Sequence, residues 1–214
     1  AAKTAGSNEA VLLAAATGHY FAALSGAGAS EGAEPVSLGL PLMNRPLGQR
    51  KTAIDPAVNV LPLLIPPRHT VAESIAAVGE TFDGARRHGA YRAEDLRRDI
   101  GLTDPDRQLT GPSFNMRPFT TRFTFGESVA ELTTISIGPV HDLEFIFQSE
   151  NDGGMDLHVL ADTALHDRRS ATAHVSQFHF EMTLWRKNSI TCRSTYSRCN
   201  RCAPALFSSC LLLF

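Results

Sequence analysis

The sequence has few of the features that mark membrane proteins or general nucleic-acid binders. None of its hydrophobic runs reaches about 18 residues, so no transmembrane helix is predicted. Twenty basic and 22 acidic residues leave a formal net charge of only −2, which argues against a uniformly basic, phosphate-binding chain. The first ten residues lack a cationic segment ahead of the apolar stretch. We therefore predict no secretory signal, no membrane or nucleic-acid partner, and a cytoplasmic location.

Signatures of catalysis and metal binding are also missing. The sequence contains no Gly-x-Ser-x-Gly nucleophile elbow, no P-loop and no dinucleotide-binding glycine motif. Eight histidines are present, but none lies in a His-Glu-x-x-His, His-x-His or His-Cys pattern. His174 and His179 are five residues apart and share a helix face poorly. A structural or surface role is favoured for each histidine, and neither a metal site nor a nucleophile–base pair is predicted for the main body.

Cysteine is absent until the last 23 residues, which contain Cys192, Cys199, Cys202 and Cys210. From Arg186 onward there are five basic and no acidic residues, so this tail carries +5 and the preceding 185 residues carry −7. The four thiolates could form a zinc site, although their spacing is not that of a zinc ribbon. The charges could instead bind RNA weakly. The favoured interpretation is a disordered tail with free thiols, residues 186–214.

The first part of the chain shows the periodicity of a globular α/β domain. An Ala-rich apolar segment, Val11–Leu24, predicts a largely buried helix that ends near Gly26. Alternating residues from Pro35 to Leu40 predict a strand closed by Pro41. The nearly continuous apolar run Val58–Ile65 has the pattern of a strand buried on both faces.

Helices and several strands follow. Thr70 and Glu73 form a capping-box pattern ahead of a helical apolar stripe, and a short helix is expected within Tyr91–Ile100. The extended segments are Phe114–Phe119, Phe123–Phe125, Leu132–Ile137, Asp142–Ser149 and Met155–Ala161. Asp167 or Ser170 would cap a last helix that runs toward Trp185. This order predicts an α/β (α+β) two-layer sandwich, in which helices pack on one face of a mixed sheet.

Two asparagines stand in apolar surroundings. Asn59 lies inside the apolar run of its strand, and Asn115 lies in the segment Ser113–Arg117. A buried amide without partners costs about 1–3 kcal/mol, so each must be hydrogen-bonded. A structural bridge to a neighbouring loop is favoured for Asn59. For Asn115, a structural role and a role in lining a channel both stay open.

Five segments together resemble the condensation domains of nonribosomal peptide synthetases. In chain order these segments, with the family pattern that each resembles, are Val36–Arg45 (Val-x-x-Gly-x-Pro-x-x-x-Arg), Val58–Leu63 (Asn-[Thr/Val]-Leu-Pro-Leu), Arg86–Leu96 (His-Gln-x-Tyr-x-x-Glu-x-Leu, with Gly89 at the Gln position), Gly111–Phe119 (Gly-Pro-x-x-Asn-x-x-x-Phe) and Gly138–Glu144 (Gly-Pro-Val-x-Asp-Leu). No single segment is specific, but five in the family's order and spacing are. The second and fourth are most similar to domains of the enterobactin synthetase type, which join an aryl acyl group to an amino acid.

The resemblance implies a fold and a reaction. Condensation domains have two lobes that resemble chloramphenicol acetyltransferase, and carrier-bound thioesters meet in a tunnel between them to form an amide. Their His-His-x-x-x-Asp-Gly motif lies in the N-terminal lobe, and the present sequence has no adjacent histidine pair. Residues 1–185 are therefore expected to form the C-terminal, acceptor-side lobe of an N-terminally truncated domain, which is inactive alone.

The resemblance also implies a site and partners. Asn44, Arg45, Asn115 and Arg117 are expected to line the substrate tunnel, and no residue of this chain is predicted to be catalytic or to bind a metal. No cofactor would bind directly, because phosphopantetheine is carried by the partner carrier domains. The expected partners are an N-terminal lobe, peptidyl or aryl carrier domains and an adenylation domain.

Two alternatives to a catalytic lobe stay open. The chain could be a non-catalytic docking lobe for a carrier domain, or the translated product of a gene fragment without function. The family pattern stops after Trp185, which we interpret as a frameshift or a read-through.

Overall fold

Two compact units make up the computed structural model, which describes residues 9–26, 34–43, 58–67, 70–117, 122–131, 139–149, 154–187 and 210–213. The first unit lies within Ala1–Phe114 and Leu184–Tyr196, and the second within Asn115–Thr183 and Ser197–Phe214. Among the described segments, no helix combines the length and apolar character needed to cross a membrane.

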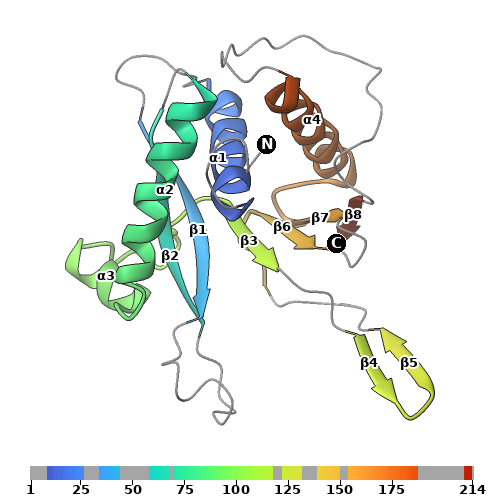
Figure 1. The fold of residues 1–214 in the computed structure, drawn as a ribbon. Helices are drawn as coiled ribbons and strands as arrows, with labels where there is room; N and C mark the ends of the chain where they lie inside the picture. The colour runs from blue at the N-terminus through green and yellow to red at the C-terminus, as the bar shows by residue number, and fades with distance from the viewer. Residues whose placement is uncertain are drawn as a thin grey trace. The chain divides into compact units, whose positions relative to one another are not determined.

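In the first unit, two long helices pack beside an antiparallel pair of strands (Figure 1). Its elements are α1 (Glu9–Leu24), β1 (Val36–Met43), β2 (Val58–Ile65), α2 (Val71–Arg87) and α3 (Ala93–Asp99). Strand β1 pairs antiparallel with β2 and, at Gly39, parallel with the first residue of β3. Both α1 and α2 contact β2, and they also contact each other. The predicted arrangement of helices on a mixed sheet is confirmed.

Only one face of the β1–β2 pair is buried. Alternate residues, among them Leu38, Leu61 and Leu63, face inward and are buried in the core. On the opposite face Met43 and Val58, which are cross-strand partners, are 65% and 62% exposed. The prediction that the Val58–Ile65 strand is buried on both faces is therefore wrong, because the helices cover a single face.

Strand β1 does not end at Pro41, as the sequence predicted, but continues to Met43. The main-chain N–H of Gly39 donates to Pro112 O at 2.9 Å, and Ser37 O accepts from Gly111 N at 3.0 Å. Odd-numbered residues of β1 thus direct their main-chain groups away from β2. The missing N–H of Pro41 interrupts no hydrogen bond of the β1–β2 ladder, so the strand tolerates the proline.

Local signals at the helix ends act as the sequence predicts. The hydroxyl of Thr70 accepts a hydrogen bond from Glu73 N, and the Glu73 carboxylate accepts one from Thr70 N, which completes the capping box of α2. Gly26 follows α1 with a φ of 71°, a left-handed conformation that favours glycine.

Helix α1 approaches β2 so closely at Gly18 that a side chain has no room there. A Cβ atom at this position would lie 2.5 Å from two γ-carbons of Ile65. We expect Gly18→Ala to destabilise the protein by about 1–2 kcal/mol, because an overpacking cost of about 1–3 kcal/mol exceeds the gain in helix propensity of up to about 1 kcal/mol. Urea denaturation followed by circular dichroism measures this difference.

The matched control is Gly84→Ala in α2. An added Cβ at Gly84 meets nothing within 4 Å, so only the gain in helix propensity remains. This variant should be about 0.5–1 kcal/mol more stable than the parent. A Gly18→Ala protein that gains as much stability as the control would contradict the close approach of α1 to β2.

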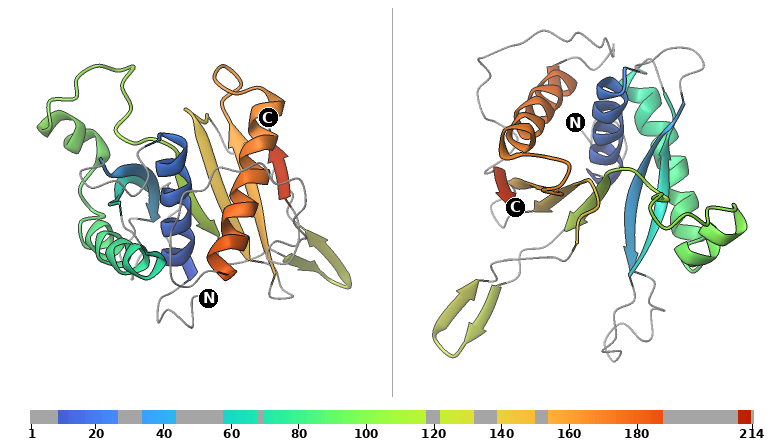
Figure 2. Two further views of the ribbon diagram at one scale, coloured as in Figure 1. Left: turned by 90° about the horizontal axis from the view of Figure 1, so that it is seen from above. Right: turned by 180° about the vertical axis from the view of Figure 1, so that it is seen from behind.

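The second unit contains the remaining strands and the last helix (Figure 2). Strands β6 (Leu143–Ser149) and β7 (Met155–Ala161) form an antiparallel pair, and β8 (Cys210–Leu213) adds parallel to β7. A separate hairpin joins β4 (Arg122–Phe125) to β5 (Ser128–Glu131). Strand β3 (Ser113–Arg117) lies next to β6.

Helix α4 (Arg168–Lys187) covers one face of β6 and β7. Phe178 is fully buried, and its ring centroid lies 5.2 Å from that of Phe145 and 5.7 Å from that of Phe147. The carboxylate of Asp167 accepts a hydrogen bond from Ser170 N at 2.7 Å. Of the two predicted caps, Asp167 is therefore the one that caps this helix.

Some expectations concern residues outside the described ranges. These include the extended segment Leu132–Ile137 and most of the 186–214 tail. Within that tail, the structure describes the last two residues of α4, Arg186 and Lys187, and strand β8 (Cys210–Leu213). The disorder expected for residues 186–214 stays a prediction. The boundary at Trp185 stays a prediction.

Candidate substrate-binding site

Two of the four predicted tunnel residues, Asn115 and Arg117, lie on β3. They are two positions apart on the strand, so their side chains project from the same face. Both are partly buried. Asn44 and Arg45 lie outside the described residues, so their place in a tunnel stays a prediction.

Asn115 contacts a carboxyl group that the sequence analysis did not assign to the site. Its amide nitrogen donates to Glu144 Oε1 on β6 at 3.2 Å. Burial raises the pKa of Glu144, while the hydrogen bond from Asn115 and the charge of Arg117 act in the opposite direction. The amide therefore holds the carboxyl group of a neighbouring strand in one orientation.

His158 on β7 is the second residue that the sequence analysis missed. Burial lowers its pKa; the charge of Asp156 raises it and the charge of Arg117 lowers it. Its Nε2 atom is buried and has no hydrogen-bond partner among the described residues. A polar residue at an alternating position of a largely apolar strand was the available signal for both Glu144 and His158.

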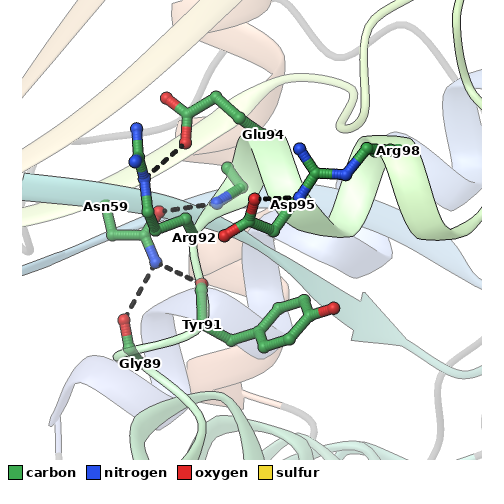
Figure 3. Close-up of polar contacts among 8 residues, drawn as sticks. Asn59, Gly89, Tyr91, Arg92, Glu94, Asp95 and Arg98 are labelled. Atoms are coloured by element: carbon green, nitrogen blue, oxygen red, sulfur yellow. Dashed lines mark hydrogen bonds and ion pairs between the residues drawn. The ribbon is translucent and has the colours of Figure 1, made fainter.

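Asn59 bridges strand β2 to a neighbouring segment of the first unit (Figure 3). Its amide nitrogen donates to Gly89 O at 2.9 Å and to Tyr91 O at 2.7 Å, and its Oδ1 accepts from Ala93 N at 3.1 Å. The side chain thus joins strand β2 to the segment between α2 and α3. The favoured sequence-based interpretation of Asn59 agrees with these contacts.

A third polar cluster closes one end of the β6–β7 pair. His166 Nε2 lies 2.7 Å from Asp142 Oδ1, and the His166 ring packs edge-on against His174 of α4. Burial lowers the pKa of His174, and His166 lowers it further. The main-chain N–H of Asp162 also donates to Asp142 O. These contacts tie the start of β6 to the loop that leads into α4, which is a structural role.

No group of three His, Cys, Asp or Glu side chains that could hold a metal ion occurs within the described segments. Cys192, Cys199 and Cys202 lie outside those segments, so the zinc and RNA alternatives for the tail stay open predictions. An open groove of about 410 Å³ lies between β2, α2 and α3 of the first unit, with Leu61, Leu64 and Ala85 in its lining. It contains none of the predicted tunnel residues.

Comparison with curated proteins finds peptide synthetases. The chain is 32% identical over 147 residues to a dimodular nonribosomal peptide synthase of Bacillus subtilis, which covers 67% of this chain and 6% of that protein. It is 30% identical over 128 residues to enterobactin synthase component F of Escherichia coli, covering 59% of this chain and 10% of that protein. The chain thus spans a tenth or less of these relatives. No family model matches the chain.

Solved condensation domains share the fold. The first condensation domain of the calcium-dependent antibiotic synthetase superposes with a TM-score of 0.73 at 22% identity, over 89% of this chain and 42% of that one. A starter condensation domain of rhizomide synthetase, in complex with C8-CoA and Leu-SNAC, gives a TM-score of 0.71 at 24% identity, over 85% and 41% of the two chains.

The solved structures indicate the fold class of the chain. The chain has the fold of a part of a condensation domain, with strands in a mixed sheet and helices packed on strands in each unit. Its sequence relatives then indicate the type of enzyme in which such a domain occurs, because they are nonribosomal peptide synthetases that include a siderophore synthetase. In both sequence and fold, the chain therefore resembles the condensation domains of nonribosomal peptide synthetases.

Proposed function

We propose that this chain contributes the acceptor-side lobe of a condensation domain, which forms an amide between two carrier-bound substrates. The observation that carries the proposal is the agreement of the fold with solved condensation domains over 85–89% of this chain but only 41–42% of theirs. The partners would be an N-terminal lobe, carrier domains that bear phosphopantetheine, and an adenylation domain. The location would be cytoplasmic.

The reaction is an aminolysis of a thioester. The acceptor amine nitrogen bonds to the thioester carbonyl carbon, the carbon–sulfur bond breaks, and the donor carrier's thiol leaves with a proton that the amine has lost. The sequence has no adjacent histidine pair to assist this proton transfer. The part of this chain would be to hold the acceptor in position, and positioning of reactants contributes several kcal/mol to such reactions.

The exposed apolar face of β1 and β2 supports a role within a larger assembly. Met43, Val58, Val60 and Leu64 form a row of exposed hydrophobic side chains on this face. Contiguous exposed apolar surface is typical of protein interfaces. The face therefore fits a lobe that is covered by a partner.

The test is reconstitution from two polypeptides. The purified chain is mixed with acyl-loaded donor and aminoacyl-loaded acceptor carrier proteins, with or without a separately produced N-terminal condensation lobe that contains His-His-x-x-x-Asp-Gly. We expect amide product, detected by mass spectrometry, only when both lobes are present. Turnover by the chain alone would contradict the proposal.

The control is the same N-terminal lobe with its second motif histidine replaced by alanine, which should give no product. If the intact lobe gives no product either, while both carriers bind the chain, the docking-lobe alternative is favoured instead. If neither carrier nor lobe binds, the proposed function is wrong.

A further inference from the structure

One face of the second unit carries a row of polar side chains opposite helix α4. Phe145 and Phe147 point toward Phe178 of α4, so the alternate residues of β6 point the other way. Glu144 pairs with Leu160 and Ile146 pairs with His158, and cross-strand partners share a face. Glu144 and His158 are therefore diagonal neighbours on the face away from the helix.

Strand β3 adds two more groups to this face. Asn115 reaches Glu144 by its hydrogen bond, and the charge of Arg117 acts on both Glu144 and His158. We call Asn115, Arg117, Glu144 and His158 the Glu144 cluster. It combines a carboxyl group, a guanidinium, an amide and an imidazole, and all four residues are partly buried.

The cluster has hydrogen-bonding capacity that the described residues do not use. The buried Nε2 of His158 has no partner among them, and a buried polar atom that lacks a hydrogen bond destabilises the protein. Asn115 occupies one oxygen of Glu144, and a carboxylate can accept several hydrogen bonds. A polar ligand that forms hydrogen bonds with both His158 Nε2 and the Glu144 carboxyl group would therefore bind favourably.

The charges on this face favour a cationic ligand. Asp156 lies opposite Gln148 and so belongs to the same face as Glu144. Burial lowers the pKa of His158, which favours its neutral form. Glu144 is partly buried and burial raises the pKa of its carboxyl group, so an ammonium group that pairs with this carboxylate would offset the cost of burying its charge.

We propose that the Glu144 cluster binds the amine end of the acceptor substrate, an aminoacyl thioester, with Glu144 accepting a hydrogen bond from the amine. Asn115 orients the Glu144 carboxyl group, and His158 Nε2 and Arg117 offer further polar contacts to the aminoacyl group. This inference rests on the proposed function, and it assigns the recognition of the amine to residues of this chain.

The experiment measures binding to the full 214-residue chain. The probe is a leucyl N-acetylcysteamine thioester mimic in which an amide replaces the thioester, so that it cannot react. Nuclear magnetic resonance titration gives the dissociation constant for the parent and for Glu144→Gln. We expect the variant to bind about tenfold or more weakly, because hydrogen bonds to charged groups contribute about 1.5–3 kcal/mol. The N-acetylated probe, which has no ammonium group, should lose binding to the parent by a similar factor.

The matched control is Glu181→Gln on α4. Burial raises the pKa of Glu181 as it does that of Glu144, but Glu181 lies on the helix and not on the polar face. This variant should bind the probe as the parent does. Thermal unfolding of both variants confirms that they are folded. Equal affinity of Glu144→Gln and the parent, equal affinity for the acetylated probe, or no binding by the parent would each overturn the proposal.

The two proposals fail separately. Amide formation by the reconstituted lobes without binding that depends on Glu144 overturns only the role of the cluster. Binding that depends on Glu144 without amide formation overturns only the proposed function.

Discussion

Replacing Phe178 by alanine is expected to destabilise the second unit by about 3–5 kcal/mol, the range for removing a buried phenylalanine from a core. Phe178 is fully buried and lies edge-on to Phe145 at a centroid distance of 5.2 Å. The alanine variant loses this aromatic contact and leaves a cavity between α4 and the β6–β7 pair. Because a small domain is stable by only about 5–15 kcal/mol, this is a large fraction of the total.

Hydrogen exchange measured by mass spectrometry, together with urea denaturation, locates the effect. Amides of β6, β7 and α4 should exchange faster in Phe178→Ala, in proportion to the lost stability. The control is Leu165→Ala in the loop before α4, where the side chain is 64% exposed and its removal should change stability by less than about 0.5 kcal/mol. Equal stability of the two variants would contradict the described packing of α4 on these strands.

Replacing Asn59 by alanine is expected to cost about 2–4 kcal/mol. The side chain makes three hydrogen bonds, to Gly89 O, Tyr91 O and Ala93 N, and each contributes about 0.5–1.5 kcal/mol. The alanine variant also leaves these main-chain groups without their partner. Urea denaturation measures the loss, and faster hydrogen exchange in the α2–α3 segment identifies its place.

Asn59→Asp separates the hydrogen bonds from side-chain size. The aspartate keeps an acceptor for Ala93 N but directs a carboxylate at the two carbonyl oxygens that the amide now donates to. We expect it to be at least as destabilising as alanine at neutral pH, with part of the loss recovered at low pH when the carboxyl is protonated and can donate. An Asn59→Ala protein as stable as the parent would show that Asn59 is not the bridge described above.

Features that depend on neighbouring residues were predictable from the sequence. The capping box of α2 needs only Thr70 and Glu73, and the sequence limited the cap of α4 to Asp167 or Ser170, of which Asp167 is the one that caps the helix. The apolar run of β2 showed the bounds of that strand, Val58–Ile65. The condensation-domain resemblance rested on short segments in order, which the fold comparison supports.

Features that depend on distant residues were not predictable in the same way. The apolar run of β2 could not show that helices would cover only one of its faces, because that depends on where α1 and α2 pack. The tolerance of Pro41 depends on which strand lies on each side of β1. Of the residues in the candidate site, Asn115 and Arg117 were predicted from the family resemblance. Glu144 and His158 were identified only from the sheet, in which β3, β6 and β7 are neighbouring strands.

The sequence by itself determined the capping box of α2 and the bounds of the apolar strand β2, because these depend on residues within a few positions of one another. It also determined the family resemblance, which rests on short segments and their order along the chain. Only the tertiary structure decided which faces are buried, which backbone groups Asn59 joins and which carboxyl group Asn115 holds. Asn59 lies 30 to 34 residues from its partners, and Asn115 lies 29 residues from Glu144. Contacts over such separations form only when strands and helices pack, and no local pattern specifies them.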